Sequence, residues 1–107
     1  SNIYSLFGNA IDNAIEYLLK KDMDKRFIRL HVKGINDMIS IHIENYCDDD
    51  IQIVDGLPKT TKADKLYHGF GTISMKKIVE SYDGEIFLKR SDSLFVVNIL
   101  IPIKENK

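Results

Sequence analysis

The sequence predicts an α+β fold in which helices cover one face of a mainly antiparallel sheet, giving a two-layer α/β sandwich. Two observations predict it. Apolar residues recur at helical spacing in two segments, and they alternate with polar residues in two pairs of strand-length segments. The order along the chain is helix, hairpin, loop, helix, hairpin. Short turns join the strands of each pair, so each pair is expected to be antiparallel.

The first helix is expected over residues 3–20. At 100° per residue, one face collects apolar side chains: Ile3, Phe7, Ala10, Ile11, Ala14 and Leu18. The opposite face collects polar ones: Asn9, Asp12, Asn13, Glu16 and Lys20. Two alternating runs follow at 27–33 and 38–44, with turn residues at 34–37 between them. These runs predict a hairpin with one apolar face, typical of a sheet that helices cover on one side only.

The periodicity fails over residues 46–71, which predicts a long loop, either a functional lid or a partly disordered segment. A second helix is expected at 72–82, with Ile73, Ile78 and Val79 inward and a stop at Asp83-Gly84. Two further strands are expected at 85–89 and 94–103. Pro102 is compatible with a strand end.

The composition indicates one globular domain spanning residues 1–107. The 15 Lys and Arg residues nearly balance the 16 Asp and Glu residues, so we expect no nucleic-acid partner, which would favour a basic excess. No apolar stretch is long enough to span a bilayer, so no membrane contact is expected of this domain. The one cysteine, Cys47, excludes an internal disulfide and fits a reducing compartment. The chain starts almost inside a helix, which suggests a fragment of a longer protein, truncated at its N-terminus.

Two asparagines on the first helix are candidate ligands. Asn9 and Asn13 stack one turn apart, although asparagine is an unfavourable residue inside a helix. Their carbonyl oxygens could face Mg²⁺, which takes one or two protein oxygens besides water and phosphate. The spacing alone leaves a second interpretation open, in which both amides face water.

The segment His68-Gly69-Phe70-Gly71 leads directly into the second helix. Glycines allow the backbone to approach phosphates, and a helix N-terminus presents unpaired N–H groups. Taken alone, the same pattern fits a tight turn that starts a helix. It is neither a Walker loop nor a dinucleotide fingerprint, because it lacks Gly-Lys-Ser/Thr and a surrounding βαβ unit.

The two motifs together resemble the GHKL ATPase superfamily, whose Bergerat fold includes an ATP lid. Residues 6–16, Leu-Phe-Gly-Asn-Ala-Ile-Asp-Asn-Ala-Ile-Glu, are similar to the N box of sensor histidine kinases. Thr60-Thr61-Lys62 before the glycine motif most resembles the AgrC-like peptide quorum-sensing subfamily. The resemblance covers nearly the whole chain and implies a lid at about 46–71.

The resemblance also implies roles for individual residues. Asn13 matches the Mg²⁺-coordinating asparagine and Asn9 its partner near the phosphates, so both are catalytic candidates. Four further residues are candidate ATP contacts: Tyr17, Lys62, Gly69 and Gly71. Asn45 stands where the family has an aspartate that bonds the adenine amino group, and the glycines that normally follow it are replaced by Tyr46-Cys47-Asp48-Asp49. An amide oxygen accepts a weaker hydrogen bond than a carboxylate does.

The residue at position 9 bears on the reaction. Family members that hydrolyse ATP have a glutamate there as general base, and Asn9 cannot take a proton at neutral pH. Phosphoryl transfer to a separate acceptor is therefore favoured over hydrolysis. None of the three histidines lies in a helical acceptor context, so the acceptor histidine is expected on another domain.

The resemblance thus implies the catalytic, ATP-binding domain of a two-component sensor histidine kinase. Its expected partners are the dimerisation and phosphoacceptor domain of the parent kinase and, indirectly, a response regulator. The expected location is the cytoplasmic side of a membrane-anchored parent. Two alternatives remain open: a degenerate GHKL regulatory module with weak or absent nucleotide binding, and a serine kinase of the anti-sigma-factor type.

Overall fold

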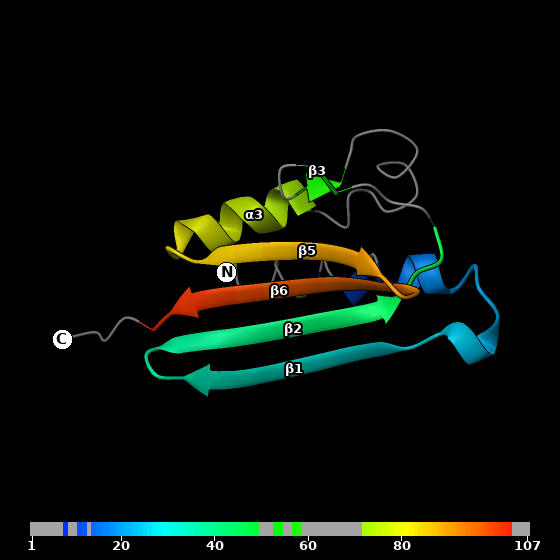
Figure 1. Ribbon diagram of the computed structural model, residues 1–107, viewed down its shortest axis with the longest axis horizontal. Helices are drawn as coiled ribbons and strands as arrows, with labels where there is room; N and C mark the ends of the chain where they lie inside the picture. The colour runs from blue at the N-terminus through cyan, green and yellow to red at the C-terminus, as the bar shows by residue number, and fades with distance from the viewer. Residues whose placement is uncertain are drawn as a thin grey trace.

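A four-stranded antiparallel sheet forms the framework of the molecule (Figure 1). The computed structural model describes residues 8, 11–12, 14–49, 53–54, 57–58 and 72–103. The strand order is β1-β2-β6-β5. The strands are β1 (Ile28–Ile35), β2 (Met38–Tyr46), β5 (Glu85–Ser91) and β6 (Leu94–Pro102). Both predicted hairpins are present, and their strands β2 and β6 meet in the middle of the sheet.

Tight turns close the two hairpins. Ile35 pairs with Met38 at the first turn, where Asn36 has a φ of 53°. At the second turn Ser91 pairs with Leu94, and Asp92 and Ser93 both have positive φ values, of 49° and 60°. Two positive φ values in a two-residue loop suit the right-handed twist of the flanking strands. The turn expected at 34–37 is present but is limited to Asn36 and Asp37, because β1 ends two residues later than predicted and includes Gly34 and Ile35.

The hydrophobic core lies on one face of the sheet. Alternate strand residues point to opposite faces, and the buried set on β2 and β6 consists of Ile41, Ile43, Phe95, Val97, Ile99 and Ile101. The first helix, with described helical residues 8, 11–12 and 14–18, contributes Ala14, Tyr17 and Leu18 to the same core. Helix α3 (Thr72–Ser81) contributes Met75 and Val79. These contacts confirm the predicted class, a sheet with helices on one face.

The end of α3 is fixed by Asp83 and Gly84, as predicted. Asp83 takes a φ of 60°, and the Gly84 amide donates to the carbonyl oxygen of Val79 over 2.9 Å. Gly84 is also packed closely against β6, because a Cβ atom at this position would lie 2.5 Å from the Leu100 carbonyl oxygen. No residue other than glycine fits there without movement of the backbone.

One expectation about the first hairpin is wrong. The apolar side chains of β1 were expected to lie under helices, yet Leu30 and Val32 remain 46% and 56% exposed. They face the same side as Ile43 and Ile41, with which they are paired. The end of the first helix lies near the start of this strand, where Ile15, Leu18 and Ile28 line a common pocket, and Ile28 packs against the core. Leu30 and Val32, further along β1, stay about half exposed.

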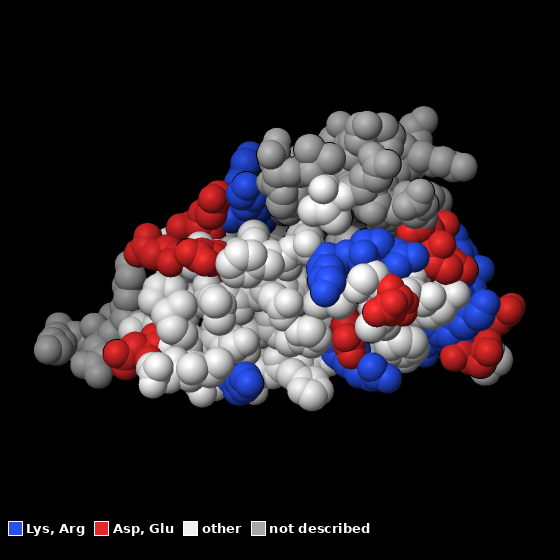
Figure 2. All heavy atoms as spheres, in the orientation of Figure 1, with Lys and Arg blue, Asp and Glu red and all other residues white. Residues whose placement is uncertain are grey.

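Short elements complete the described structure. A 3-10 turn, η1 (Met23–Lys25), follows the first helix. Within the segment predicted as a loop, β3 (Ile53–Val54) pairs with β4 (Leu57–Pro58). Among the residues described, no helix combines the length and the apolar character needed to cross a bilayer. Figure 2 shows charged side chains gathered toward the two ends of the molecule, with a largely uncharged middle.

Candidate functional site

Asn45 is a buried polar residue at the end of a central strand. It is 3% exposed, and it is the one polar or charged side chain that the described structure buries. It shares the helix-covered face of β2 with Ile41 and Ile43. A buried amide costs free energy unless it has hydrogen-bonding partners, so its presence in an apolar core marks a candidate site.

The orientation of the Asn45 amide follows from its neighbour. The side-chain nitrogen donates to the carbonyl oxygen of Tyr46 over 2.8 Å. A carbonyl can only accept a hydrogen bond, so the nitrogen must face it. The amide oxygen of Asn45 is therefore the atom that a ligand with an N–H donor can use. The exocyclic amino group of adenine is such a donor.

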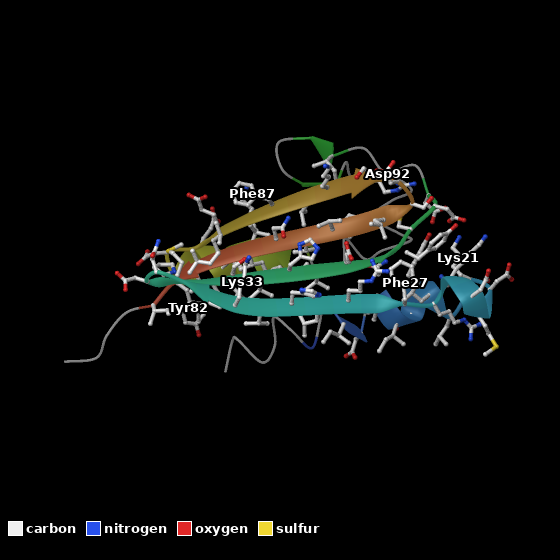
Figure 3. All side chains as sticks on the ribbon, turned by 60° about the horizontal axis from the view of Figure 1, so that its bottom comes forward. Lys21, Phe27, Lys33, Tyr82, Phe87 and Asp92 are labelled. Carbon is white, nitrogen blue, oxygen red and sulfur yellow. The ribbon has the colours of Figure 1, made fainter. Side chains whose placement is uncertain are left out.

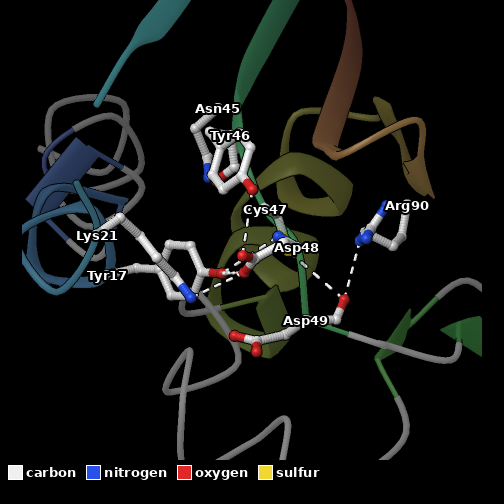
Figure 4. A network of polar contacts seen from close by, with 8 residues as sticks. All are labelled: Tyr17, Lys21, Asn45, Tyr46, Cys47, Asp48, Asp49 and Arg90. Carbon is white, nitrogen blue, oxygen red and sulfur yellow. Dashed lines mark hydrogen bonds and ion pairs between the residues drawn. The ribbon is translucent and has the colours of Figure 1, made fainter. Parts of the chain in front are cut away.

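Beyond Asn45, the carboxylate of Asp48 gathers three donors (Figure 4). Its Oδ1 accepts hydrogen bonds from the Tyr17 hydroxyl at 3.1 Å and from the Lys21 ammonium at 2.8 Å. Its Oδ2 accepts one from the Tyr46 hydroxyl at 3.1 Å. The three donors come from the first helix, from the residues just after it and from the end of β2. Asp48 thus fastens β2 to the first helix.

The ion pair changes the proton affinity of both partners. The Lys21 hydrogen bond, helped by those of the two tyrosines, lowers the pKa of Asp48 to about 2. Asp48 in turn raises the pKa of Lys21 above its ordinary value, mainly through the same hydrogen bond. Both groups are therefore charged at neutral pH.

The other side of this segment is held by the second hairpin. The backbone amide of Cys47 donates to the carbonyl oxygen of Ser93, and Arg90 Nε donates to that of Asp49, each over 2.9 Å. Cys47 itself is fully buried. Residues 45–49 are consequently fixed from two directions although they contain no glycine. This is the stretch in which the family pattern would place its glycines.

Tyr17 belongs both to the core and to the polar network around Asp48. Its ring is 3% exposed and belongs to the hydrophobic core, while its hydroxyl reaches Asp48. The Lys21 ammonium lies 5.1 Å from the centre of the ring, within cation–π range. Two of the residues predicted from sequence, Tyr17 and Asn45, are thus near one another: Tyr17 bonds Asp48, and Asn45 lies three residues before Asp48 and bonds the carbonyl oxygen of Tyr46.

The other predicted site residues lie outside the residues that the structure describes: Asn9, Asn13, Lys62, Gly69 and Gly71. Their roles remain predictions. The described polar face of the first helix agrees with the sequence pattern, because Asp12 and Glu16 are exposed while Ala14 between them is buried.

The sequence did not identify Lys21, Asp48 or Arg90 as part of the site. The spacing of Tyr17 and Lys21, four residues apart, places them one helical turn apart. Asp48, however, lies 27 residues from Lys21, and Asp49 lies 41 residues from Arg90. Such pairs become visible only when the fold is known.

A family model described as GHKL domain matches residues 1–102. No curated protein matches the chain significantly. Among solved structures, the histidine kinase AdeS of Acinetobacter baumannii is similar, with 15% sequence identity and a TM-score of 0.49. The match covers 90% of this chain and 47% of that one, so the chain spans about half the length of AdeS.

Proposed function

The chain belongs to the GHKL family, and from this premise we propose that it binds ATP with Mg²⁺ as the catalytic domain of a sensor histidine kinase. In this proposal the terminal phosphate passes to a histidine on a separate dimerisation domain of a longer parent protein. A response regulator would then receive the phosphate. The parent would be anchored in the membrane with this domain on the cytoplasmic side.

The observation that carries the proposal is the orientation of Asn45. Its amide nitrogen is engaged by Tyr46, so its oxygen is left to accept a hydrogen bond at a buried position. A purine amino group is a donor of the required kind. The apolar residues around it lower the local polarity, which strengthens such a hydrogen bond relative to one in solution.

The remaining roles follow the sequence motifs. Asn13 would hold Mg²⁺ through its side-chain oxygen, and bound Mg²⁺ would neutralise charge on the phosphates. Lys62 and the backbone at Gly69 and Gly71 would contact the phosphates. Tyr17 would support the nucleotide site through its position at the end of the first helix, because its hydroxyl already donates its one proton to Asp48.

Transfer is favoured over hydrolysis because of Asn9. An amide cannot accept a proton from water at neutral pH, so this position provides no general base. A transfer reaction needs mainly positioning and charge stabilisation from the protein. An acceptor histidine docked from another domain meets that requirement.

Calorimetric titration of the chain with Mg·ATP tests nucleotide binding. We expect saturable, Mg-dependent binding in the wild type and a roughly three- to tenfold weaker affinity in Asn45→Ala, from the lost hydrogen bond. Asn36→Gly is the matched control, because Asn36 is exposed in a turn with a φ that glycine adopts freely. Equal affinity in wild type and Asn45→Ala, with both shown to be folded by circular dichroism, would exclude the proposed adenine contact.

Phosphoryl transfer needs its own test. The chain is incubated with radiolabelled Mg·ATP and a helical acceptor fragment that carries a histidine. We expect acid-labile label on the acceptor, and neither Mg-dependent binding nor transfer with Asn13→Ala. Binding without transfer to any acceptor would limit the function to nucleotide binding.

The rigid segment after Asn45 favours one competing function, a regulatory module that has lost nucleotide binding. Asp48 and Arg90 hold this segment from both sides, where the family pattern has glycines. Thermal shift separates the two functions. A ligand present at 100 times its dissociation constant adds about 2.7 kcal/mol of stability, whereas a module without a nucleotide site gains none.

A further inference from the structure

The face of the sheet opposite the helices contains a cavity lined by polar side chains. Its volume is about 300 Å³, and its lining consists of His31, Lys33, Ser40, His42 and Asn98. The strand register brings them together: Lys33 pairs with Ser40 on the neighbouring strand, and His42 pairs with both His31 and Asn98. Figure 3 shows this face, with Lys33 and Phe87 labelled on the two outer strands.

None of the residues that line this cavity is a carboxylate. The two ring nitrogens of His42 face Asn98 and Glu44. The donors left for a ligand are therefore the Lys33 ammonium, the His31 imidazole, the Ser40 hydroxyl and the Asn98 amide nitrogen. Among the described residues, no group of three or more His, Cys, Asp or Glu side chains is placed to hold a metal ion, so these two histidines do not form a metal site with a neighbouring ligand. The lining suits an anion that has several acceptor oxygens.

The nearest acidic group is already engaged. Glu44 Oε1 accepts from Arg29 at 2.9 Å, and Glu44 Oε2 lies 3.4 Å from His42 Nε2. The Arg29 hydrogen bond is the main reason that the pKa of Glu44 is lowered. Arg29 therefore neutralises the charge of Glu44. Among the described residues Lys33 forms no ion pair, so its positive charge is available beside the cavity.

The two central side chains are held in place by each other. His42 Nδ1 lies 2.5 Å from Asn98 Oδ1, and an amide oxygen can only accept, so His42 is the donor in this contact. The amide nitrogen of Asn98 is then left as a donor for a ligand. The His31 ring meets the His42 ring nearly edge to face, with 6.4 Å between centroids. Donor groups are thereby positioned before any ligand arrives.

We infer that this cavity is a binding site for a small tetrahedral oxyanion such as phosphate. Its donors come from three adjacent strands, so they approach a ligand from several directions. The oxygens of a tetrahedral anion also point in several directions, whereas a carboxylate has two oxygens in one plane. The site is separate from the proposed nucleotide site, since Asn45 lies on the helix-covered face.

Inorganic phosphate is the probe for this site. Nuclear magnetic resonance at pH 6.5 and constant ionic strength follows the ring signals of His31 and His42 as phosphate is added. We expect saturable shifts of both rings, similar shifts with sulfate, and none with acetate. Lys33→Ala should weaken the phosphate affinity by up to about fivefold, the effect of one exposed charge-assisted contact. Lys89→Ala is the matched control, an exposed lysine on β5 of the same sheet that does not line the cavity.

Three results would overturn the inference: shifts that grow linearly without saturation, an equal response to acetate, or an unchanged affinity in Lys33→Ala. The result is independent of the proposed nucleotide binding. Phosphate binding should persist in Asn45→Ala, and Mg·ATP binding should persist in Lys33→Ala. If phosphate fails to bind while Mg·ATP binds, only the oxyanion site is wrong, and the opposite outcome refutes only nucleotide binding.

Discussion

The hydroxyl of Tyr17 donates a hydrogen bond to Oδ1 of Asp48 over 3.1 Å, joining the first helix to the segment that follows β2. The backbone amide of Asp48 in turn donates a hydrogen bond to the same hydroxyl oxygen over 3.4 Å. The helix with the predicted Mg²⁺ ligand and the strand with the predicted adenine contact are therefore linked by one side-chain pair. Changes at this pair should affect both stability and nucleotide binding.

Tyr17→Phe removes the hydroxyl and keeps the buried ring. We expect a loss of about 1 kcal/mol in the free energy of unfolding, the usual net value of one hydrogen bond. Urea denaturation measures this loss. Tyr82→Phe serves as control, because Tyr82 is at the surface. If both variants lose the same stability, the contact with Asp48 does not stabilise the fold.

Asp48→Asn should change the pH dependence of stability. Folding lowers the pKa of Asp48 from 3.8 to about 2. A lowered pKa means that the carboxylate stabilises the fold fully above about pH 4, and that this contribution is lost as the pH falls toward 2. The melting temperature of the wild type should exceed that of the variant at pH 6, and the two should converge by pH 2. A difference that stays constant over this range would contradict the assignment.

Asn45→Asp should have opposite effects on the free and nucleotide-bound protein. A charge buried at this position costs stability, so the melting temperature without ligand should fall. A carboxylate accepts a stronger hydrogen bond from an amino group than an amide does. The increase in melting temperature on addition of Mg·ATP should therefore be larger than in the wild type. An equal or smaller increase would argue against adenine at this residue.

Gly84→Ala should be destabilising because the added methyl group meets the backbone of β6. The Cβ atom would lie 2.5 Å from the Leu100 carbonyl oxygen, and relieving that overlap costs about 1–3 kcal/mol. Gly34→Ala is the control, since the nearest atom to its Cβ lies at 4.0 Å. Urea denaturation of the two variants compares them, and similar stabilities would show that α3 moves away from β6 at little cost.

The sequence predicts the sheet well because alternation is a local property. Apolar and polar residues alternate along β1 and most of β2, and the turn residues between them predict the hairpin, although β1 ends two residues later than expected. The same alternation could not show that Leu30 and Val32 would stay exposed. Periodicity reveals which face a side chain occupies, and it does not reveal whether another element covers that face.

The candidate site could be predicted only in part. Asn45 was identified because a motif marked its position; it is buried at the end of β2, and its role there stays a prediction. Lys21 and Arg90 belong to no recognisable sequence motif, and the residues with which they form hydrogen bonds are distant in sequence. The short ladder of β3 and β4 was missed because two residues are too few to show a period.

The exposed side of β1 has a practical consequence for handling the purified protein. Outer strands invite pairing with a second molecule. In an antiparallel pairing of two copies centred on His31 of β1, Arg29 of each copy would lie opposite Lys33 of the other. The repulsion between these positive charges opposes association. Salt shortens the reach of that repulsion, to about 3 Å at molar concentrations. Concentrated stocks should therefore stay monomeric in dilute buffer and begin to self-associate as ionic strength rises.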